Sequence, residues 1–326
     1  MVIFKSSRRE PTNRPLRQSD NRHKLPFPLC SLVVLVSVLA ASRSASAGQA
    51  LSSTAASASN TVTAVSLLSL PPRSWVVDAA ANELIALHHP GSYIRYRMHV
   101  IDDKGDQLRD VIESKDGAVA RLIMRNGQPL TNEADQAEQA RLKGMIASPS
   151  NFAKHIKNDE TGRKIADDII KLMPDAMIYT YTPGQPQTSQ NPGSQQIVLD
   201  FEPNPKFKPP TTTSESLSGL QGRVWIDSKT RQLVRMEGNL FRPVNLGWGM
   251  LAHIYPGGKL TLDQTDAGGN RWIFTHFDQK VTVRALMVKN VNVRVNVSAS
   301  DFQILPGPIP YQEAIKMLLA TPLPTN

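Results

Sequence analysis

The sequence is almost without cysteine, because Cys30 is the only one among 326 residues. Cys30 lies within an N-terminal segment that has the parts of a cleaved secretory signal, as described below. Once that segment is removed, no thiol remains in the chain. Disulfide bonds, thiolate metal sites and cysteine nucleophiles are therefore excluded together.

Aromatic residues are also sparse, at 6% of the chain. The apolar run at residues 29–41 contains 13 residues, which is too short for a helix that must cross a hydrocarbon core of about 30 Å. We therefore expect no transmembrane span after the leader is removed. The hydrophobic content of 40% is nevertheless enough for an ordinary globular core.

The net charge of +9 is concentrated near the beginning of the chain. Residues 1–47 contain eight Lys or Arg residues against Glu10 and Asp20, so the remainder has 29 basic and 26 acidic residues and a net charge of only +3. No basic stripe interleaved with aromatic residues is left in that remainder. We therefore expect no nucleic-acid partner.

The leader combines a basic beginning, the apolar run at 29–41 and the small-residue sequence Ala45-Ser46-Ala47. These are the parts of a secretory signal peptide, and they predict cleavage after Ala47. The protein is then expected to be exported, and to reside in the periplasm or in association with the outer envelope.

Four segments follow from this reading of the chain. Residues 1–47 are the expected signal peptide, and residues 48–73, rich in Ser, Ala and Pro, predict a flexible lead-in. Residues 74–320 are expected to form one domain, and residues 321–326 a tail. The irregular stretches between the strands of that domain are interpreted as surface loops.

Motifs that would indicate an enzyme are few. The histidines are dispersed without the H-E-x-x-H spacing, and no G-x-S-x-G nucleophile elbow occurs. The acidic segment at 102–106 lacks the length and the final Glu of a calcium loop, so it predicts a solvated hairpin turn. His88 and His89 end a predicted helix, where a cation meets the helix dipole favourably. We expect no catalytic residues, no metal and no cofactor, and an enzyme is the least favoured class.

Residues 223–300 have the composition of successive β-strands separated by turns, and carry the strongest pattern of the chain. The expected strands are 223–227, 232–241, 250–255, 259–264, 271–277 and 281–299. In the last of these, four valines alternate with polar residues: Val291, Val293, Val295 and Val297 against Asn292, Arg294, Asn296 and Ser298. Successive side chains of a strand point to opposite faces, so this alternation predicts a half-buried strand of a large antiparallel sheet.

The rest of the chain predicts further helices and strands. A helix from Ser74 to the Pro90-Gly91 stop is expected to bury one face, made of Val77, Ala81, Leu84, Ile85 and His88. The other expected elements are strands at 93–101, 108–114 and 118–125 with turns at Gly105, Gly117 and Gly127, helices at 131–146 and 150–173 with breaks at Ser148-Pro149 and near Gly162, strands at 176–182 and 197–202, and a last helix starting at Pro310. In the helix at 150–173, Ile165, Ile169, Leu172 and Met173 are expected to form a single apolar stripe. Strands and helices are segregated along the chain, which predicts an α+β fold with a curved antiparallel sheet.

One hairpin resembles a known family. Residues 222–237 contain Val224-Trp225-Ile226-Asp227 followed by Thr230, and they resemble the hairpin of periplasmic lipoprotein-sorting carriers and their lipid-binding relatives. The strand at 196–203, which ends in Pro203, is similar to the strand that precedes this hairpin in such proteins. The resemblance implies an unclosed β-barrel with helices packed in or over its concave face, above an apolar cavity.

Two functions from different classes follow from these observations. The first is a non-enzymatic exported protein that binds a lipid, or the acyl chain of a lipoprotein, in an apolar cavity between sheet and helices. The residues expected to line that cavity are Val234, Met236, Trp272, Phe274, Val291, Val293, Val295 and Val297. The second is an interaction or sensor module of the cell envelope, with a filled core and a protein partner. The aromatic residues Trp225, Trp248, Trp272, Phe274 and Phe277 either line the cavity or fill the core.

Overall fold

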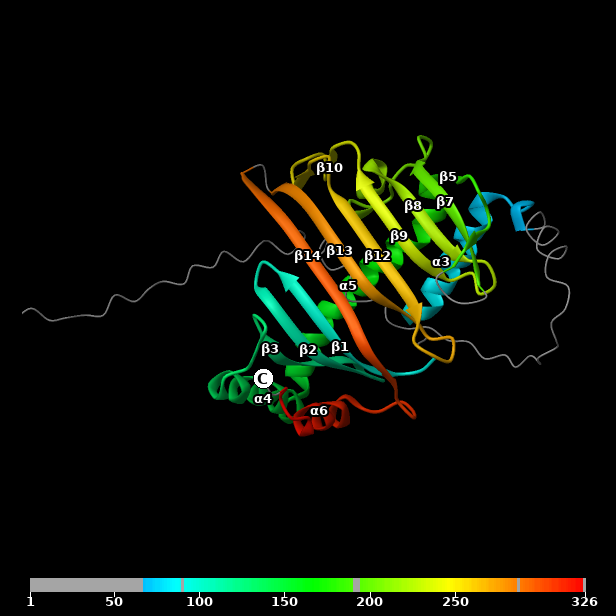
Figure 1. Cartoon of the computed structure of the whole chain (residues 1–326). Coiled ribbons are helices and arrows are strands. Elements are labelled where there is room, and N and C mark those ends of the chain that lie inside the picture. Colours follow the sequence, from blue (N-terminus) through cyan, green and yellow to red (C-terminus); the bar gives the residue numbers. More distant parts are fainter. Residues whose placement is uncertain (1–66, 89–90, 190–193, 286–287, 325–326) are drawn as a thin grey trace, which may run out of the picture.

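The computed structural model describes residues 67–88, 91–189, 194–285 and 288–324. The expected signal peptide and nearly all of the lead-in lie outside these residues, so both remain predictions. Figure 1 shows a broad curved sheet whose strands run diagonally, with α5 and α3 crossing behind it and α4 and α6 at one end.

The strands of the described part form a single antiparallel sheet of 14 strands that does not close into a barrel. The predicted α+β fold with an unclosed curved sheet is thereby confirmed. The strands are β1 (Ile94–Asp102), β2 (Gly105–Ser114), β3 (Gly117–Arg125), β4 (Gln128–Pro129), β5 (Met177–Tyr181), β6 (Gln187–Thr188), β7 (Gln195–Pro203), β8 (Leu220–Asp227), β9 (Leu233–Leu240), β10 (Val244–Leu246), β11 (Ala252–Ile254), β12 (Lys259–Asp266), β13 (Trp272–Ala285) and β14 (Lys289–Ile304).

The order of the strands places the two longest, β13 and β14, in the middle of the sheet. The order is β4-β3-β2-β1-β14-β13-β12-β9-β8-β7-β5, while β11 pairs with β10 and β13, and β6 pairs with β7. The N-terminal meander β1–β4 therefore joins the sheet through a pairing between β1 and β14 that spans most of the chain. Such a pairing closes only after β14 has formed, so the sheet depends on its last strand.

The helices of the described part are α3 (Pro72–His88), α4 (Asn132–Ala147), α5 (Pro149–Ala176), the short 3₁₀ helix η2 (Thr213–Gly219) and α6 (Tyr311–Ala320). Helix α4 begins at Thr131, whose hydroxyl accepts a hydrogen bond from the Ala134 N–H, as a capping residue does. Helix α5 begins with Pro149, which fits the first turn because that position needs no N–H.

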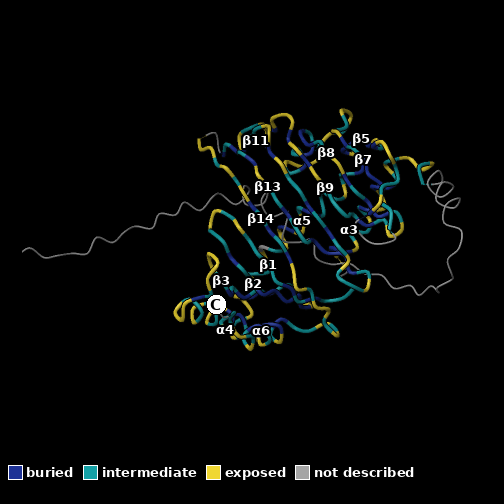
Figure 2. The backbone as a smooth tube through the Cα atoms, in the orientation of Figure 1, coloured by how far each residue is buried: buried dark blue, intermediate teal, exposed yellow. Residues whose placement is uncertain are grey.

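The alternation of apolar and polar residues makes β14 a half-buried strand, as predicted. Val295 and Val297 are buried, whereas Asn292 and Arg294 are exposed. We call the face that carries Val295 and Val297 the inner face. It bears two apolar clusters, one beneath α3 and α5 and one toward β1 and β2. Figure 2 shows buried segments in strands across the whole sheet.

The predicted strand at 281–299 was wrong in one respect, because the chain reverses within it. Strand β13 ends at Ala285 and β14 begins at Lys289, and these two residues pair with each other. The Val288 N–H donates to the Ala285 carbonyl at 3.0 Å, as in a tight turn. The turn contains no Gly, Pro, Asn or Asp, so the usual signal for a chain reversal was missing.

The predicted break near Gly162 was also wrong. Helix α5 continues from Pro149 through Gly162 to Ala176. A glycine inside a helix costs about 1 kcal/mol relative to alanine. The apolar residues on either side pack against other parts of the fold, which offsets a cost of that size.

The buried face predicted for α3 is a third correction. Val77 and Ile85 are 37% and 48% exposed, and Ala81 and His88 are exposed as well. The buried residues of α3 are instead Trp75, Val76, Ala79, Glu83, Ala86 and Leu87. Because α3 has apolar residues on several sides, its sequence is compatible with either of two buried faces. The packing of the helix against the sheet determines which of them is buried.

The opposite face of β2 and β3 is covered by α4, α6 and the beginning of α5. Ile112 and Val119 pack with these helices, whereas the neighbouring Val111 belongs to an inner-face cluster. Phe152 of α5 stacks on Tyr311 of α6, with ring centroids 3.6 Å apart. These contacts account for the apolar side of the predicted C-terminal helix.

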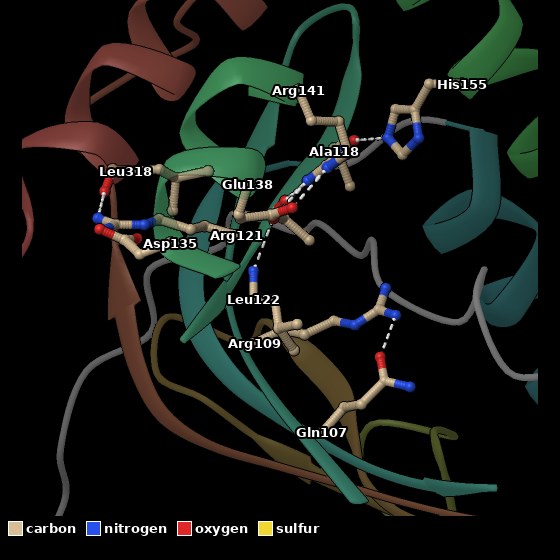
Figure 3. Close-up of polar contacts among 11 residues, drawn as sticks. Gln107, Arg109, Ala118, Arg121, Leu122, Asp135, Glu138, Arg141, His155 and Leu318 are labelled. Carbon is tan, nitrogen blue, oxygen red and sulfur yellow. Dashed lines mark hydrogen bonds and ion pairs between the residues drawn. The ribbon is translucent and has the colours of Figure 1, made fainter. Parts of the chain in front are cut away.

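A buried arginine, Arg121, joins helices α4 and α6 to the sheet (Figure 3). Arg121 of β3 is 3% exposed, and its guanidinium donates to the carbonyls of Leu318 and Thr321 at 2.7 and 2.6 Å and to Asp135 at 2.8 Å. Glu138 of α4 accepts the Leu122 N–H at 2.9 Å. The charges of this cluster are thus used to join α4 and α6 to the sheet.

Candidate functional site

An apolar cavity of about 190 Å³ lies between the inner face of the sheet and the helices α3, α5 and η2. The helices contribute mainly small and aliphatic side chains to its wall, among them Val76, Ala79, Ile165, Ala166, Ile169 and Met173. The sheet contributes side chains from β8, β9, β11, β12 and β13, among them Val224, Ile226, Met236, Leu262, Phe277 and Val281. The cavity therefore extends along the sheet across several strands.

The sequence of α5 explains one wall of this cavity. Ile165, Ile169 and Met173 repeat every four residues and line the cavity together, because residues four apart share a helix face. These three residues belong to the predicted apolar stripe of α5, and the structure shows that they face the cavity. The wall also contains Ala79 of α3 and Ala166 of α5. Longer side chains at these positions would reach the sheet, so space remains between the helices and the sheet.

Glu83 contributes a carboxyl group to the wall of this mainly apolar cavity, which Thr213, Ser216, Lys259 and Gln279 also line. It is 6% exposed, and its Oε2 accepts a hydrogen bond from the Gln264 Nε2 at 3.2 Å. Burial raises the pKa of Glu83 to about 7, and the hydrogen bond from Gln264 offsets this only in part. Near neutral pH the group is thus divided between its neutral and charged forms, and it can donate or accept a hydrogen bond.

Glu83→Gln is expected to change the pH dependence of stability. The folded pKa lies above the ordinary value of 4.5, so the folded state holds a proton that the unfolded state releases between pH 4.5 and pH 7. The contribution of Glu83 is therefore complete below pH 4.5 and is lost as the pH rises through about 7. The shift corresponds to about 3 kcal/mol. Urea unfolding of both proteins should show the variant gaining stability over the wild type by about this amount between pH 4.5 and pH 8. A difference that does not vary with pH would contradict the assignment.

Gln279 is another polar group in the wall. It is 9% exposed, lines the cavity, and its Oε1 accepts no hydrogen bond from the described residues. A buried acceptor without a partner is unfavourable unless a ligand or a water donates to it. Together with Glu83, it gives an apolar cavity two places where a hydroxyl or amine group can be held.

No protein-family model matches this chain, and no curated protein is significantly similar to it. The lipoprotein-carrier resemblance of the hairpin at 222–237 therefore remains a prediction. Its residues have a structural role in the turn between β8 and β9 and in the contact of that turn with α3.

Asp227 closes the turn between β8 and β9. Its Oδ1 accepts hydrogen bonds from the N–H groups of Lys229 and Thr230 at 3.0 and 2.8 Å and from the Thr230 hydroxyl at 3.0 Å, and Ser194 donates to its other oxygen. Burial alone would raise the pKa of Asp227, but these hydrogen bonds outweigh it and lower the pKa. The Asp and Thr of the hairpin are thus required by the turn itself.

This turn also holds helix α3 in place. Asn82 of α3 donates to the carbonyls of Thr230 and Arg231, each at 3.1 Å. The Arg231 guanidinium lies 3.5 Å from the ring centroid of Trp75, also on α3, which is a favourable cation–π distance. The hairpin therefore fixes the helix that covers the cavity.

The eight residues predicted to line a cavity differ in their surroundings. Met236 lines the cavity, and Val293 packs against both inner-face clusters. Phe274, Val295 and Val297 belong to the cluster toward β1 and β2, Trp272 is buried, and Val234 and Val291 are partly buried. A role for all eight in ligand binding stays a prediction.

The five aromatic residues considered with them differ in their surroundings. Phe277 lines the cavity, and Trp272 and Phe274 are buried. Trp225 lies between the guanidinium groups of Arg223 and Arg235, and Trp248 is 88% exposed.

Glu83 was not predicted from the sequence to line the cavity. A carboxylate in a helix is usually exposed, and only the correct choice of the buried stripe on α3 would have placed it inside. The spacing of Val76, Ala79, Glu83 and Leu87 along one helix face is the signal that would have found it.

Several other polar groups of the described part make structural contacts. Arg271 and Glu113 form a buried ion pair at 2.8 Å, and no group of three or more potential metal ligands occurs among the described residues. The acidic turn at 102–106 is a hairpin turn between β1 and β2, in which the Asp102 carboxylate accepts the Lys104 N–H at 2.8 Å. None of the helices in the described ranges is long and apolar enough to cross a membrane.

Proposed function

We propose that this protein is an exported, non-enzymatic carrier that binds the acyl chain of a lipid or lipoprotein between its sheet and its covering helices. The observation that carries the proposal is the apolar cavity between the inner face and α3, α5 and η2. Empty apolar cavities are unfavourable because their walls lose packing contacts. A chain that retains one beneath a pair of helices gains stability when an apolar ligand fills it.

The size of the cavity constrains how a ligand enters. Its volume of about 190 Å³ exceeds the roughly 150 Å³ of an engineered apolar cavity that binds benzene. It is smaller than the roughly 300–1,000 Å³ of sites for drug-sized ligands. A complete acyl chain therefore requires α3 or α5 to move away from the sheet.

The polar groups of the wall favour an amphiphile over a plain hydrocarbon. Glu83 and Gln279 lie in the wall of the cavity, and each offers a hydrogen bond to a ligand that carries a hydroxyl, amide or amine group. The resemblance to lipoprotein-sorting carriers supports the same class of ligand. No part of the proposal requires a metal, a cofactor or a covalent step.

Ala79→Met is expected to reduce binding of a fluorescent fatty acid at least tenfold. Ala79 is 5% exposed and lines the cavity, so a longer side chain occupies the space that the ligand needs. The melting temperature should stay the same or rise, because filling a cavity removes an unfavourable void. Binding is measured by titrating dansyl-labelled undecanoic acid into the purified chain and following dansyl emission.

The matched control is Ala81→Met, two residues along the same helix, where the side chain is exposed. It is expected to bind the probe as the wild type does. Equal affinity in the wild type and Ala79→Met would contradict binding in the cavity. Failure of the wild type to bind any fatty acid, together with native mass spectra free of copurified lipid, would favour the alternative of an interaction module of the cell envelope.

A further inference from the structure

Four exposed apolar side chains gather at one end of the sheet, and we call them the apolar tip. They are Trp248, Met250 and Leu251 in the loop between β10 and β11, and Val288 in the turn between β13 and β14. Their exposed fractions are 88%, 58%, 40% and 88%. Large apolar residues that are exposed together mark a contact surface more often than single ones do.

The register of the sheet brings the two loops of the tip together. Ala252, which follows Leu251 directly, pairs with Ala285, and Ala285 accepts the N–H of Val288 at 3.0 Å. The loop and Val288 therefore lie at the same end of the paired strands β11 and β13. Figure 1 shows the ends of β10, β13 and β14 at the upper edge of the molecule, away from α4 and α6.

The loop that carries Trp248 is held in a defined conformation. The Leu246 carbonyl accepts the N–H groups of Gly249 and Leu251 at 3.2 and 3.3 Å, and Glu215 of η2 accepts the Gly247 N–H at 2.8 Å. Trp248 has a φ of 56°, a left-handed conformation that is uncommon for a bulky residue. The chain thus maintains an unfavourable backbone conformation at a residue whose side chain contributes little to the core.

The parts of the chain that flank the tip carry charges of one sign. Residues 238–262 and 279–300 contain no Asp or Glu. They contain six basic residues, Arg242, Lys259, Lys280, Arg284, Lys289 and Arg294. The acidic group that reaches the tip from another element is Glu215, whose carboxylate is engaged with the Gly247 N–H.

We propose that the apolar tip docks the protein on the surface of an anionic lipid bilayer. Tryptophan is favoured at the boundary between headgroups and acyl chains, since one end of the indole is apolar and the other is polar. Basic side chains beside it are attracted to the negative potential of anionic headgroups. Four side chains projecting from two loop tips suit a fluid bilayer better than a protein partner, which requires a complementary surface of about 800 Å² on each side.

The tip lies next to the cavity. Ile254 lines the cavity, and it follows by two residues the Ala252 that begins β11 beside the exposed loop. Docking at the tip would bring that end of the cavity close to the bilayer. The docking proposal nevertheless stands independently of what the cavity binds, and its test does not use the cavity.

The test measures tryptophan fluorescence of the purified full chain with vesicles of phosphatidylcholine and phosphatidylglycerol whose acyl chains are brominated. Bromine quenches an indole that enters the acyl-chain boundary. Quenching is expected with the mixed vesicles, and it should be lost in Trp248→Phe, which still sediments with vesicles because the tip remains apolar. The buried Trp75 and Trp272 are expected to contribute little to the quenching.

Two further variants separate the apolar and charged contributions. Trp248→Ser combined with Val288→Ser is expected to weaken vesicle binding by about tenfold or more. Arg242→Ser combined with Lys289→Ser is expected to weaken binding to the anionic vesicles while leaving the weaker binding to pure phosphatidylcholine unchanged. The control is Ile178→Ser, a residue that is 42% exposed on edge strand β5 and belongs to no part of the tip.

Three results would overturn the docking proposal. The first is quenching that is the same in Trp248→Phe and in the wild type. The second is the absence of quenching with any vesicle. The third is a dimer in solution that Trp248→Ser dissociates, which would assign the tip to a second copy of the chain. Since the Ala79→Met experiment reads fatty-acid binding without vesicles, failure at the tip and failure at the cavity are distinguishable.

Discussion

Val295→Asp is expected to destabilise the folded protein by roughly 3–5 kcal/mol, or to prevent folding altogether. Val295 is 8% exposed and lies in an inner-face cluster with Phe277 and Val297. A carboxylate at this position lies among apolar side chains, so it must either remain charged in apolar surroundings or take up a proton. Since domains of this kind are stable by only about 5–15 kcal/mol, the change removes a large share of the total. Thermal and urea unfolding measure it directly.

The neighbouring residue provides the control for this prediction. Arg294 is exposed on the opposite face of the same strand, and Arg294→Ala is expected to change stability by no more than about 0.5 kcal/mol. The same contrast should recur between Val293→Asp and Asn292→Ala, because a period of two holds along the whole strand. Equal tolerance at Val295 and Arg294 would contradict the half-buried position of β14.

Gly222→Ala is expected to cost about 3 kcal/mol or more, even though it adds only one methyl group. A Cβ atom at this position would lie 1.9 Å from the carbonyl oxygen of Glu237 on the neighbouring strand. Because that atom belongs to the backbone, no side-chain rotation relieves the contact, and β8 must move away from β9. The hairpin formed by these strands holds α3, so the expected result is a lower melting temperature together with weaker fatty-acid binding.

Gly307→Ala is the matched control, since a Cβ atom there meets no other atom within 4 Å. Its stability is expected to remain within about 0.5 kcal/mol of the wild type. A Gly222→Ala protein that melts at the wild-type temperature would show that β8 and β9 are farther apart at Gly222 than the structure places them.

The elements that the sequence predicted well are those in which local chemistry is decisive. The β1, β2 and β3 meander was predicted from its Gly-containing turns, and each strand was found within a few residues of its expected bounds. The helix expected at 131–146 was found as α4, and Thr131 is its capping residue. In such elements the signal and its structural cause lie within a few residues of each other.

The errors arose where two local patterns were equally good. Helix α3 is apolar on several sides, and the contacts of Trp75 with Arg231 and of Asn82 with the same turn select the side that faces the sheet. The reversal after Ala285 interrupts an alternation that continues on both sides of it. The face of α3 could not be predicted from local pattern, because the residues in contact are separated by more than a hundred positions. The reversal after Ala285 could not be predicted because the turn contains no turn-forming residue.

For the candidate cavity, too, the sequence determined some features and the tertiary structure determined the others. By itself the sequence determined that β14 has one apolar face, that α5 carries an apolar stripe, and that the fold is a segregated α+β arrangement. Only the tertiary structure decided that Glu83 and Gln279 lie in the wall of the cavity and that Trp248 and Val288 meet at one exposed tip. The physical reason is that periodicity fixes which side chains share a face of one element, whereas the pairing of β1 with β14 and of β11 with β13 fixes which faces meet.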